Sequence, residues 1–234
     1  MGIVGCATVG ETLKRLRSQR DLMRAAAYSG GAALALTLYI AWHGTPAPGD
    51  IDVITWFQDI GFFSNNASWV NALGTFEWQA LSLAVALLCA ALGPRLGLHG
   101  GSVGERTAAV WAFVLAFALR MFSTPLKEMA QANRPSLDFH VRVTADFPGY
   151  GFPSGHVFSD VLVFGAIAVF APRLIGAGAG AAVRVACVAV LVLAGPARMA
   201  VGAHWPSDVL GGYLWGIAAL CVAVAGGRRL AGQR

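Results

Sequence analysis

Charged residues are scarce in this chain of 234 residues. Asp, Glu, Lys and Arg together make up 12% of it, hydrophobic residues make up 56%, and the mean hydropathy is +0.61. A soluble domain carries roughly 25% charged residues, so the composition argues against a soluble protein and indicates an integral membrane protein. The length allows one bundle of several spans and no sizeable second domain. We expect the bilayer as its partner and no nucleic acid.

Cysteine is also rare, and no two cysteines form a CxxC pair. The four are Cys6, Cys89, Cys187 and Cys221, three of them inside apolar runs. This spacing excludes a disulfide framework or a zinc site and is typical of small buried residues. Asp50 and Asp52 are the one pair of acids that resembles a metal site, and we expect them in a solvated loop instead.

Six apolar segments approach the roughly 20 residues that cross a bilayer. Their length, and their Ala, Leu and Val content without alternation, favour helices over strands. We therefore predict an all-α bundle of six transmembrane helices in one domain, with a turn at the Gly/Ala-rich tract 176–182. The predicted spans are 25–42, 78–92, 108–125, 157–171, 181–201 and 209–225. The domain covers 25–226, after a basic segment 1–24 that suits an interfacial helix and before a basic tail 227–234.

Basic residues are absent from the connection 44–77. In the six-span arrangement, twelve of the seventeen Lys and Arg residues lie on the opposite side, which the positive-inside rule makes cytoplasmic, together with both termini. The other five lie at the outer ends of spans three to five, where basic residues are costly and usually functional. They are Arg120, Lys127, Arg134, Arg142 and Arg198.

The first of three motifs on this outer side is KEMAQANRP. Lys127 and Arg134 are seven residues apart, which on a helix places them on one face, and Pro135 favours ending that helix. Two cations on one face suggest an anion clamp. The alternative is a helix end whose long side chains reach the interface.

The second motif is PSGH, which leads into the fourth apolar run. Ser154 suits the N-cap of that helix, Gly155 permits close approach to the backbone, and His156 lies in the first turn. The free N–H groups and the positive dipole end of a helix start favour an anion. The alternative is an ordinary capped helix with an interfacial histidine.

The third motif is RMAVGAHWPSD, between the fifth and sixth spans. Asp208 follows His204 by four residues, so its carboxylate can accept the Nδ1–H and leave Nε2 with a lone pair. Such a histidine is a nucleophile or a base. The alternative is a structural His–Asp pair at a helix start. With Arg198, the three motifs bring three cations, a helix start and two histidines to one side, which chance does not readily explain.

Together the motifs resemble those of the type 2 phosphatidic acid phosphatase family, whose site is shared with vanadium haloperoxidases. The family pattern is K-x6-R-P, then P-S-G-H, then S-R-x5-H-x3-D, and the resemblance covers about residues 120–213. The first two motifs are complete here. In the third, Ala197 stands where the family usually has serine, which puts one phosphate or water contact in doubt.

The resemblance implies a role for each motif residue. Lys127, Arg134 and Arg198 would bind the phosphate oxygens, and Ser154 and Gly155 would add to this cradle at the helix start. Two further cations have less certain roles. Arg120 would meet a second phosphate or pair within the bundle, and Arg142 would meet a second phosphate or remain solvated.

The implied chemistry is metal-independent phosphate hydrolysis with no cofactor. His204 would attack phosphorus and form a phosphohistidine, Asp208 would orient it, and His156 would protonate the leaving group. Water would then hydrolyse the phosphohistidine. One histidine must start neutral and the other protonated, which predicts a bell-shaped pH dependence that persists in EDTA.

A site at the outer interface favours a lipid phosphate over a soluble sugar phosphate. The candidate substrates are undecaprenyl diphosphate, phosphatidic acid and phosphatidylglycerol phosphate, with a slight preference for the diphosphate because of the two extra cations. The resemblance implies a bacterial inner membrane with the site on the periplasmic side. The alternatives are a lipid phosphotransferase and a non-catalytic anion or lipid transporter.

Overall fold

The computed structural model describes residues 19–232, apart from 96 and 99, and every regular element in that part of the chain is helical. The predicted all-α class is confirmed. Residues 1–18, which hold most of the expected interfacial segment, lie outside the described part. The elements are α2 (Gln19–His43), α3 (Asp50–Asp59), α4 (Gly61–Leu73), α5 (Phe76–Leu92), α6 (Val103–Leu119), η1 (Arg120–Phe122), α7 (Ser123–Ala130), η2 (Leu137–Phe139), α8 (Gly155–Leu174), α9 (Ala177–Ala200) and α10 (Pro206–Leu230).

Five helices are long and apolar enough to cross a membrane, and a sixth span results if the bent pair α4–α5 counts as one. Each of the six predicted segments lies within one of these candidate spans, to within one residue. Two differences concern the connections. The segment 44–77 carries the short helices α3 and α4, and the tract 176–182 is not a turn, because α9 begins at Ala177 and only Gly176, with φ 90°, turns the chain.

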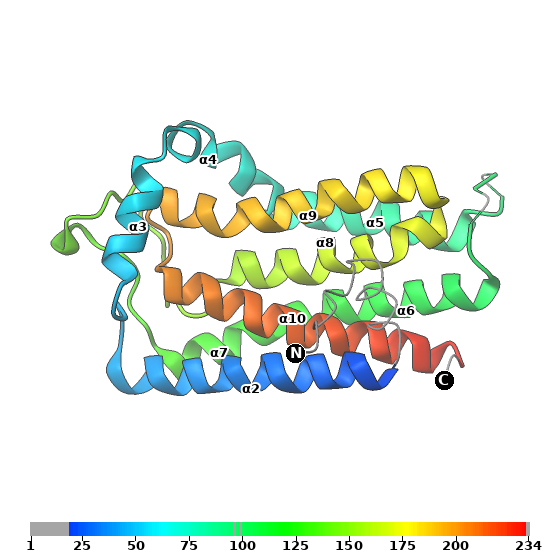
Figure 1. The fold of residues 1–234 in the computed structure, drawn as a ribbon, viewed down its shortest axis with the longest axis horizontal. Coiled ribbons are helices and arrows are strands. Elements are labelled where there is room, and N and C mark those ends of the chain that lie inside the picture. Colours follow the sequence, from blue (N-terminus) through cyan, green and yellow to red (C-terminus); the bar gives the residue numbers. More distant parts are fainter. Residues whose placement is uncertain (1–18, 96, 99, 233–234) are drawn as a thin grey trace, which may run out of the picture.

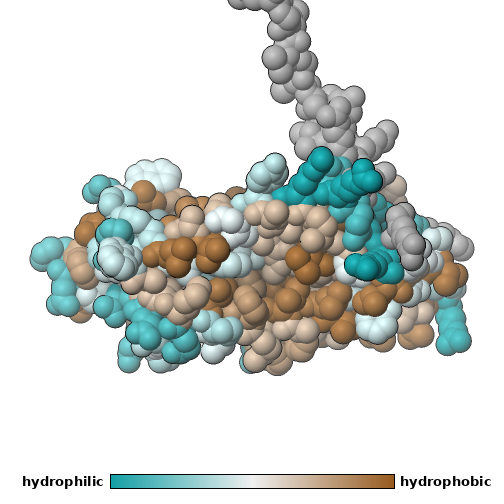
Figure 2. Space-filling view, turned by 90° about the horizontal axis from the view of Figure 1, so that it is seen from below, coloured by the Kyte–Doolittle hydropathy of each residue, from teal (hydrophilic) through white to brown (hydrophobic). Residues whose placement is uncertain are grey.

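Helix α8 lies in the middle of the bundle, with α5, α6, α9 and α10 around it, and α2 packs against α10 on the outside (Figure 1). It is buried along most of its length, whereas α2 and α9 expose apolar side chains such as Leu38 and Val185. Figure 2 shows hydrophobic residues over the middle of one face and hydrophilic residues towards its two ends. This distribution suits a bilayer around the bundle.

Two glycines set how closely α10 approaches α8. A Cβ at Gly212 would lie 2.8 Å from the carbonyl oxygen of Ser154, and one at Gly216 would lie 2.8 Å from Cβ of Val161. Small residues four apart let two helices in a membrane pack with their backbones close together. This contact holds the start of α10 against the start of α8, where two of the three motifs lie.

The two ends of the bundle differ. At one end, Gln19 in α2 donates to the carbonyl oxygen of Ala225 in α10 at 3.1 Å. The helices then run to the opposite end, where α2 ends and both α8 and α10 begin (Figure 1). All three sequence motifs gather at this opposite end, beside α3.

Candidate active site

Three segments that are distant in the sequence meet at this end of the bundle: the loop after α7, the start of α8 and the turn between α9 and α10. Backbone hydrogen bonds join them. The N–H of Ser154 donates to the carbonyl oxygen of Asp208 at 2.9 Å, and the N–H of Gly151 donates to that of Ala132 at 2.8 Å. These bonds fix the relative positions of the three motifs before any ligand binds.

His204 contacts both Asp208 and Arg134. Its Nδ1 lies 3.3 Å from Oδ2 of Asp208, whereas Nη1 of Arg134 lies over the ring, 3.2 Å from Nε2 and 3.5 Å from Nδ1. A carboxylate only accepts, so Nδ1 carries the proton and Nε2 the lone pair. The same Asp208 oxygen accepts the N–H of Trp205 at 3.0 Å. A Cβ at Gly151 would lie 2.7 Å from this oxygen, so glycine there leaves room for the carboxylate.

Burial and neighbouring cations keep the His204 ring neutral. Only 2% of the residue is exposed. Burial, then the charges of Arg134, Arg198 and Lys127, lower the pKa of His204 well below its ordinary value of 6.5. The ring therefore remains neutral at physiological pH.

Lys127 and Arg134 are fixed by backbone carbonyl groups. Lys127 Nζ donates to the carbonyl oxygen of Tyr150 at 2.6 Å, and Arg134 donates to those of Gly149 at 3.0 Å and Ala203 at 2.7 Å. The seven-residue spacing predicted that the two cations share one helix, and this prediction is wrong. Helix α7 ends at Ala130, because the next residue is left-handed at φ 47°, and Arg134 reaches the site from the loop.

Arg198 approaches from the last turn of α9. Arg198 is 7% exposed, and its guanidinium lies 5.3 Å from the ring centroid of Phe147. Its buried Nε has no hydrogen-bond partner among the described residues. A buried donor without a partner is costly and rare. An anion between the three cations would satisfy it.

The start of α8 completes the cradle. Ser154 occupies the N-cap position, but its hydroxyl makes no capping bond, contrary to our expectation, and the buried Oγ has no partner within the described structure. A Cβ at Gly155 would lie 3.7 Å from Cε of Lys127, so the helix start and the lysine adjoin each other. His156 follows within the first turn and interacts electrostatically with Lys127, Arg134 and Arg198.

The two additional arginines have different surroundings. Arg120, in η1, packs its guanidinium over Phe76 and Phe117, with its carbon 5.1 Å and 5.5 Å from the ring centroids. Its buried Nε has no hydrogen-bond partner among the described residues, and its charge acts on His156. Arg142 bonds the backbone of Gln58 and lies 3.2 Å from Oδ1 of Asp59. The structure therefore ties Arg142 to α3 on the outer loop.

The structure also shows residues that the motifs did not reveal. We expected Asp50 in a solvated loop, but it is only 4% exposed. Its carboxylate accepts hydrogen bonds from the backbone N–H of Ser207 at 2.9 Å and from Ser207 Oγ at 2.7 Å. Burial raises its pKa above the usual value. Asp160 and Gln79, which are buried beside the site, were also not predicted from the sequence. The spacing of four residues between His156 and Asp160 could have indicated Asp160, whereas no sequence pattern indicates Gln79.

Comparisons with known proteins agree with this arrangement. A family model described as the PAP2 superfamily matches residues 108–230, more than half of the chain. No curated protein matches. The crystal structure of a transmembrane PAP2-type phosphatidylglycerolphosphate phosphatase from Bacillus subtilis has a TM-score of 0.66 at 19% identity, covering 86% of this chain and 94% of that one. The predicted family is confirmed: the chain is a multi-pass membrane protein and belongs to the PAP2 superfamily.

Proposed function

We propose that this protein is a lipid phosphatase that transfers a phosphoryl group first to His204 and then to water. One observation carries the proposal: the charges of three cations act on a neutral, buried histidine whose Nδ1–H is bound by Asp208, which leaves the Nε2 lone pair free. Positive charge arranged in advance around phosphorus supplies most of the stabilisation in phosphoryl transfer. Lys127, Arg134 and Arg198 provide it here, so the scheme requires no metal ion.

The steps follow from the arrangement of the side chains. A phosphate group between Arg134 and His204 replaces their present contact, and Nε2 of His204 attacks phosphorus while the bond to the leaving oxygen breaks. Asp208 stabilises the positive ring that forms, and His156 gives its proton to the leaving oxygen. A water molecule then attacks the phosphohistidine, the P–N bond breaks, and the protons of the water leave with the phosphate.

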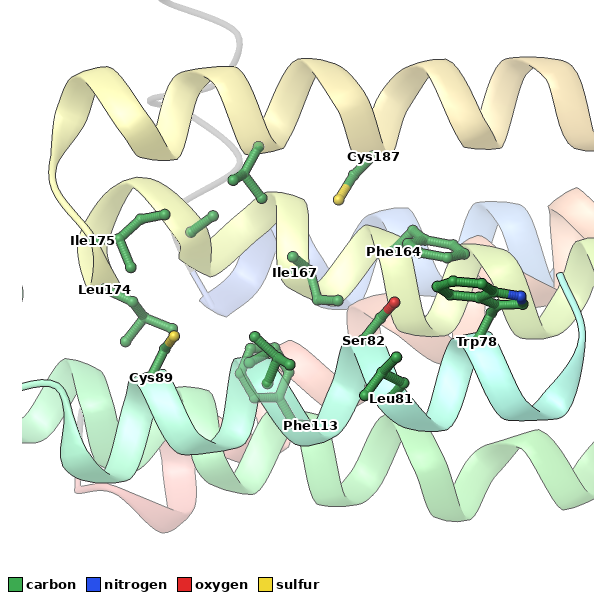
Figure 3. Close-up of a pocket in the computed structure, with 14 residues that line it drawn as sticks. Trp78, Leu81, Ser82, Cys89, Phe113, Phe164, Ile167, Leu174, Ile175 and Cys187 are labelled. Carbon is green, nitrogen blue, oxygen red and sulfur yellow. The ribbon is translucent and has the colours of Figure 1, made fainter. Parts of the chain in front are cut away.

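An apolar cavity beside the site supports a lipid substrate. It has a volume of about 390 Å³ and lies between α5, α8 and α9. Figure 3 shows Trp78 and Phe164 at one end and Leu174, Ile175 and Cys89 at the other. Trp78 is next to Gln79, and Phe164 is one turn beyond Asp160, so the cavity begins near the phosphate site. We propose that a hydrocarbon chain of the substrate lies there.

Filling this cavity should select against long chains. Ser82 points into it from α5 (Figure 3), so Ser82→Trp should lower kcat/KM for a long-chain phosphatidic acid by about tenfold, because a chain that is excluded displaces the headgroup. Hydrolysis of water-soluble 4-nitrophenyl phosphate should not change. Ala84→Trp, on an exposed face of the same helix, is the matched control. Equal losses on both substrates would contradict the chain site.

The placement of Arg142 favours a phosphomonoester over a diphosphate. Arg142 is engaged with Asp59, so of the two additional cations only Arg120, whose charge acts on His156, remains near the cradle. We therefore propose a phosphomonoester in place of the slight preference for undecaprenyl diphosphate drawn from the sequence. We further propose that the site faces the periplasm, because the basic residues at the opposite end mark the cytoplasmic side.

The first test is phosphate release by the purified protein in detergent with EDTA. We expect release from phosphatidic acid or phosphatidylglycerol phosphate, faster than from undecaprenyl diphosphate, and undiminished by the chelator. Loss of activity in EDTA would contradict the metal-free scheme. Transfer of the phosphoryl group to another lipid without phosphate release would indicate a phosphotransferase, and binding without turnover would indicate a transporter.

A further inference from the structure

Both histidines of the site begin the same short pattern. His156 opens His-Val-Phe-Ser-Asp and His204 opens His-Trp-Pro-Ser-Asp, so a carboxylate stands four residues after each. Asp208 is the partner of His204, whereas Asp160 has no role in the scheme above. Residues four apart on a helix are neighbours on one face, and both His156 and Asp160 lie in α8.

The break between α4 and α5 encloses this second pair. A Cβ at Gly74 would lie 3.0 Å from Cδ2 of His156 and 2.9 Å from Oδ2 of Asp160. Both side chains therefore border the same narrow space, and the backbone of Gly74 closes it. Any larger residue at this position would have to displace one of them.

Gln79 fixes the carboxylate in this orientation. Its Nε2 donates to Oδ1 of Asp160 at 2.7 Å and to the carbonyl oxygen of Gly74 at 3.1 Å. Gln79 is fully buried and Asp160 is 2% exposed. One carboxylate oxygen is thus held by the amide. The other borders the same space beside Gly74 as Cδ2 of His156, without a direct hydrogen bond between the two side chains.

The surrounding charges explain why a carboxylate is useful here. Positive residues approach His156 from four other segments and interact with it: Arg120 in η1, Lys127 in α7, Arg134 in the loop and Arg198 in α9. Like charges disfavour a protonated imidazole. Asp208 is engaged with His204, while Asp160 interacts electrostatically with Arg120 and Arg198 on the side where His156 lies.

We propose that Asp160 is a positioning residue for His156: across the space beside Gly74, its negative charge stabilises the protonated form of His156 that donates to the leaving oxygen. The inference rests on the proposed function. When His204 attacks an alkyl phosphate, the P–O bond breaks and the alkoxide takes its proton from His156. A 4-nitrophenolate leaving group is stable as an anion and needs no proton. Losing Asp160 should therefore affect the first reaction and spare the second.

The test compares Asp160→Asn with the wild-type protein on two substrates. We expect kcat to fall by about 10- to 100-fold on dihexanoyl phosphatidic acid, the range for losing a group that supports a reacting one, and by less than about threefold on 4-nitrophenyl phosphate. His156→Gln should show the same selectivity. Retained hydrolysis of the aryl phosphate also shows that the variant is folded. Glu128→Gln, an exposed acid on α7, is the matched control.

Two results would overturn the role of Asp160 and leave the proposed phosphatase function standing. Equal loss on both substrates would show that Asp160 serves the phosphate cradle, through Arg198, or the fold. An unchanged rate on the alkyl phosphate would show that His156 does not depend on it. If the wild-type protein releases phosphate from neither substrate, the proposed function fails, and this inference with it.

Discussion

Replacing His204 by Gln should lower kcat by about 10⁴-fold or more, the scale seen when a nucleophile that acts with its partners is removed. Glutamine preserves most of the volume of a side chain that is 2% exposed, and its amide can still donate to Asp208. It has no ring nitrogen with which to attack phosphorus. The three cations and the start of α8 remain in place, so inorganic phosphate should still bind.

Phosphate release and equilibrium binding of orthophosphate together check this prediction. We expect turnover to disappear while binding changes by less than about threefold, because the phosphate contacts come mainly from charged side chains. His140→Gln, at an exposed histidine in the outer loop, should behave as the wild type does. A His204→Gln protein that keeps substantial turnover would remove His204 from the role of nucleophile.

The same histidine should set the acidic side of the pH dependence. Its pKa is lowered by burial and by Arg134, so the neutral, active form persists below pH 6.5 and is lost only as the pH falls through that lowered value. We expect the acidic limb of kcat/KM for the wild type well below the ordinary histidine range. An acidic limb near 6.5 would instead indicate that His204 is hydrated and not held among the cations.

The second large effect should come from Asp208→Asn, with kcat reduced by about 10⁴-fold, as for the corresponding change in a catalytic triad. The carboxylate now accepts from Nδ1 of His204 and from the N–H of Trp205. An asparagine can keep its oxygen at this position and still accept both bonds. It carries no negative charge, however, so it cannot stabilise the positive ring that forms when Nε2 attacks phosphorus.

A nearby buried carboxylate provides the control for this change. Asp50 is 4% exposed and accepts from Ser207 at the start of α10, but it does not contact the histidine. Asp50→Asn should therefore cost less than about tenfold in kcat, whatever it does to stability. Similar losses in both variants would show that any negative charge near the start of α10 suffices, and that direct contact between the carboxylate and His204 is not required.

The sequence by itself determined the membrane class, six apolar segments and the residues that bear the chemistry. These features are local: hydropathy follows from composition, and the separation of His204 and Asp208 by four residues fixes a contact that a single turn can make. A prediction based on local spacing also proved wrong. The seven-residue spacing of Lys127 and Arg134 suggested one helix, but α7 ends between them.

Only the tertiary structure decided which charges share the site. Gly212 and Gly216 allow α10 to approach α8, and this contact places His204 opposite the helix start that carries His156. Arg142 is a cation like Arg134 in the sequence, yet it is drawn to Asp59 on the outer loop. Contacts of this kind join residues that are distant along the chain, and their geometry depends on how the helices pack, which spacing does not encode.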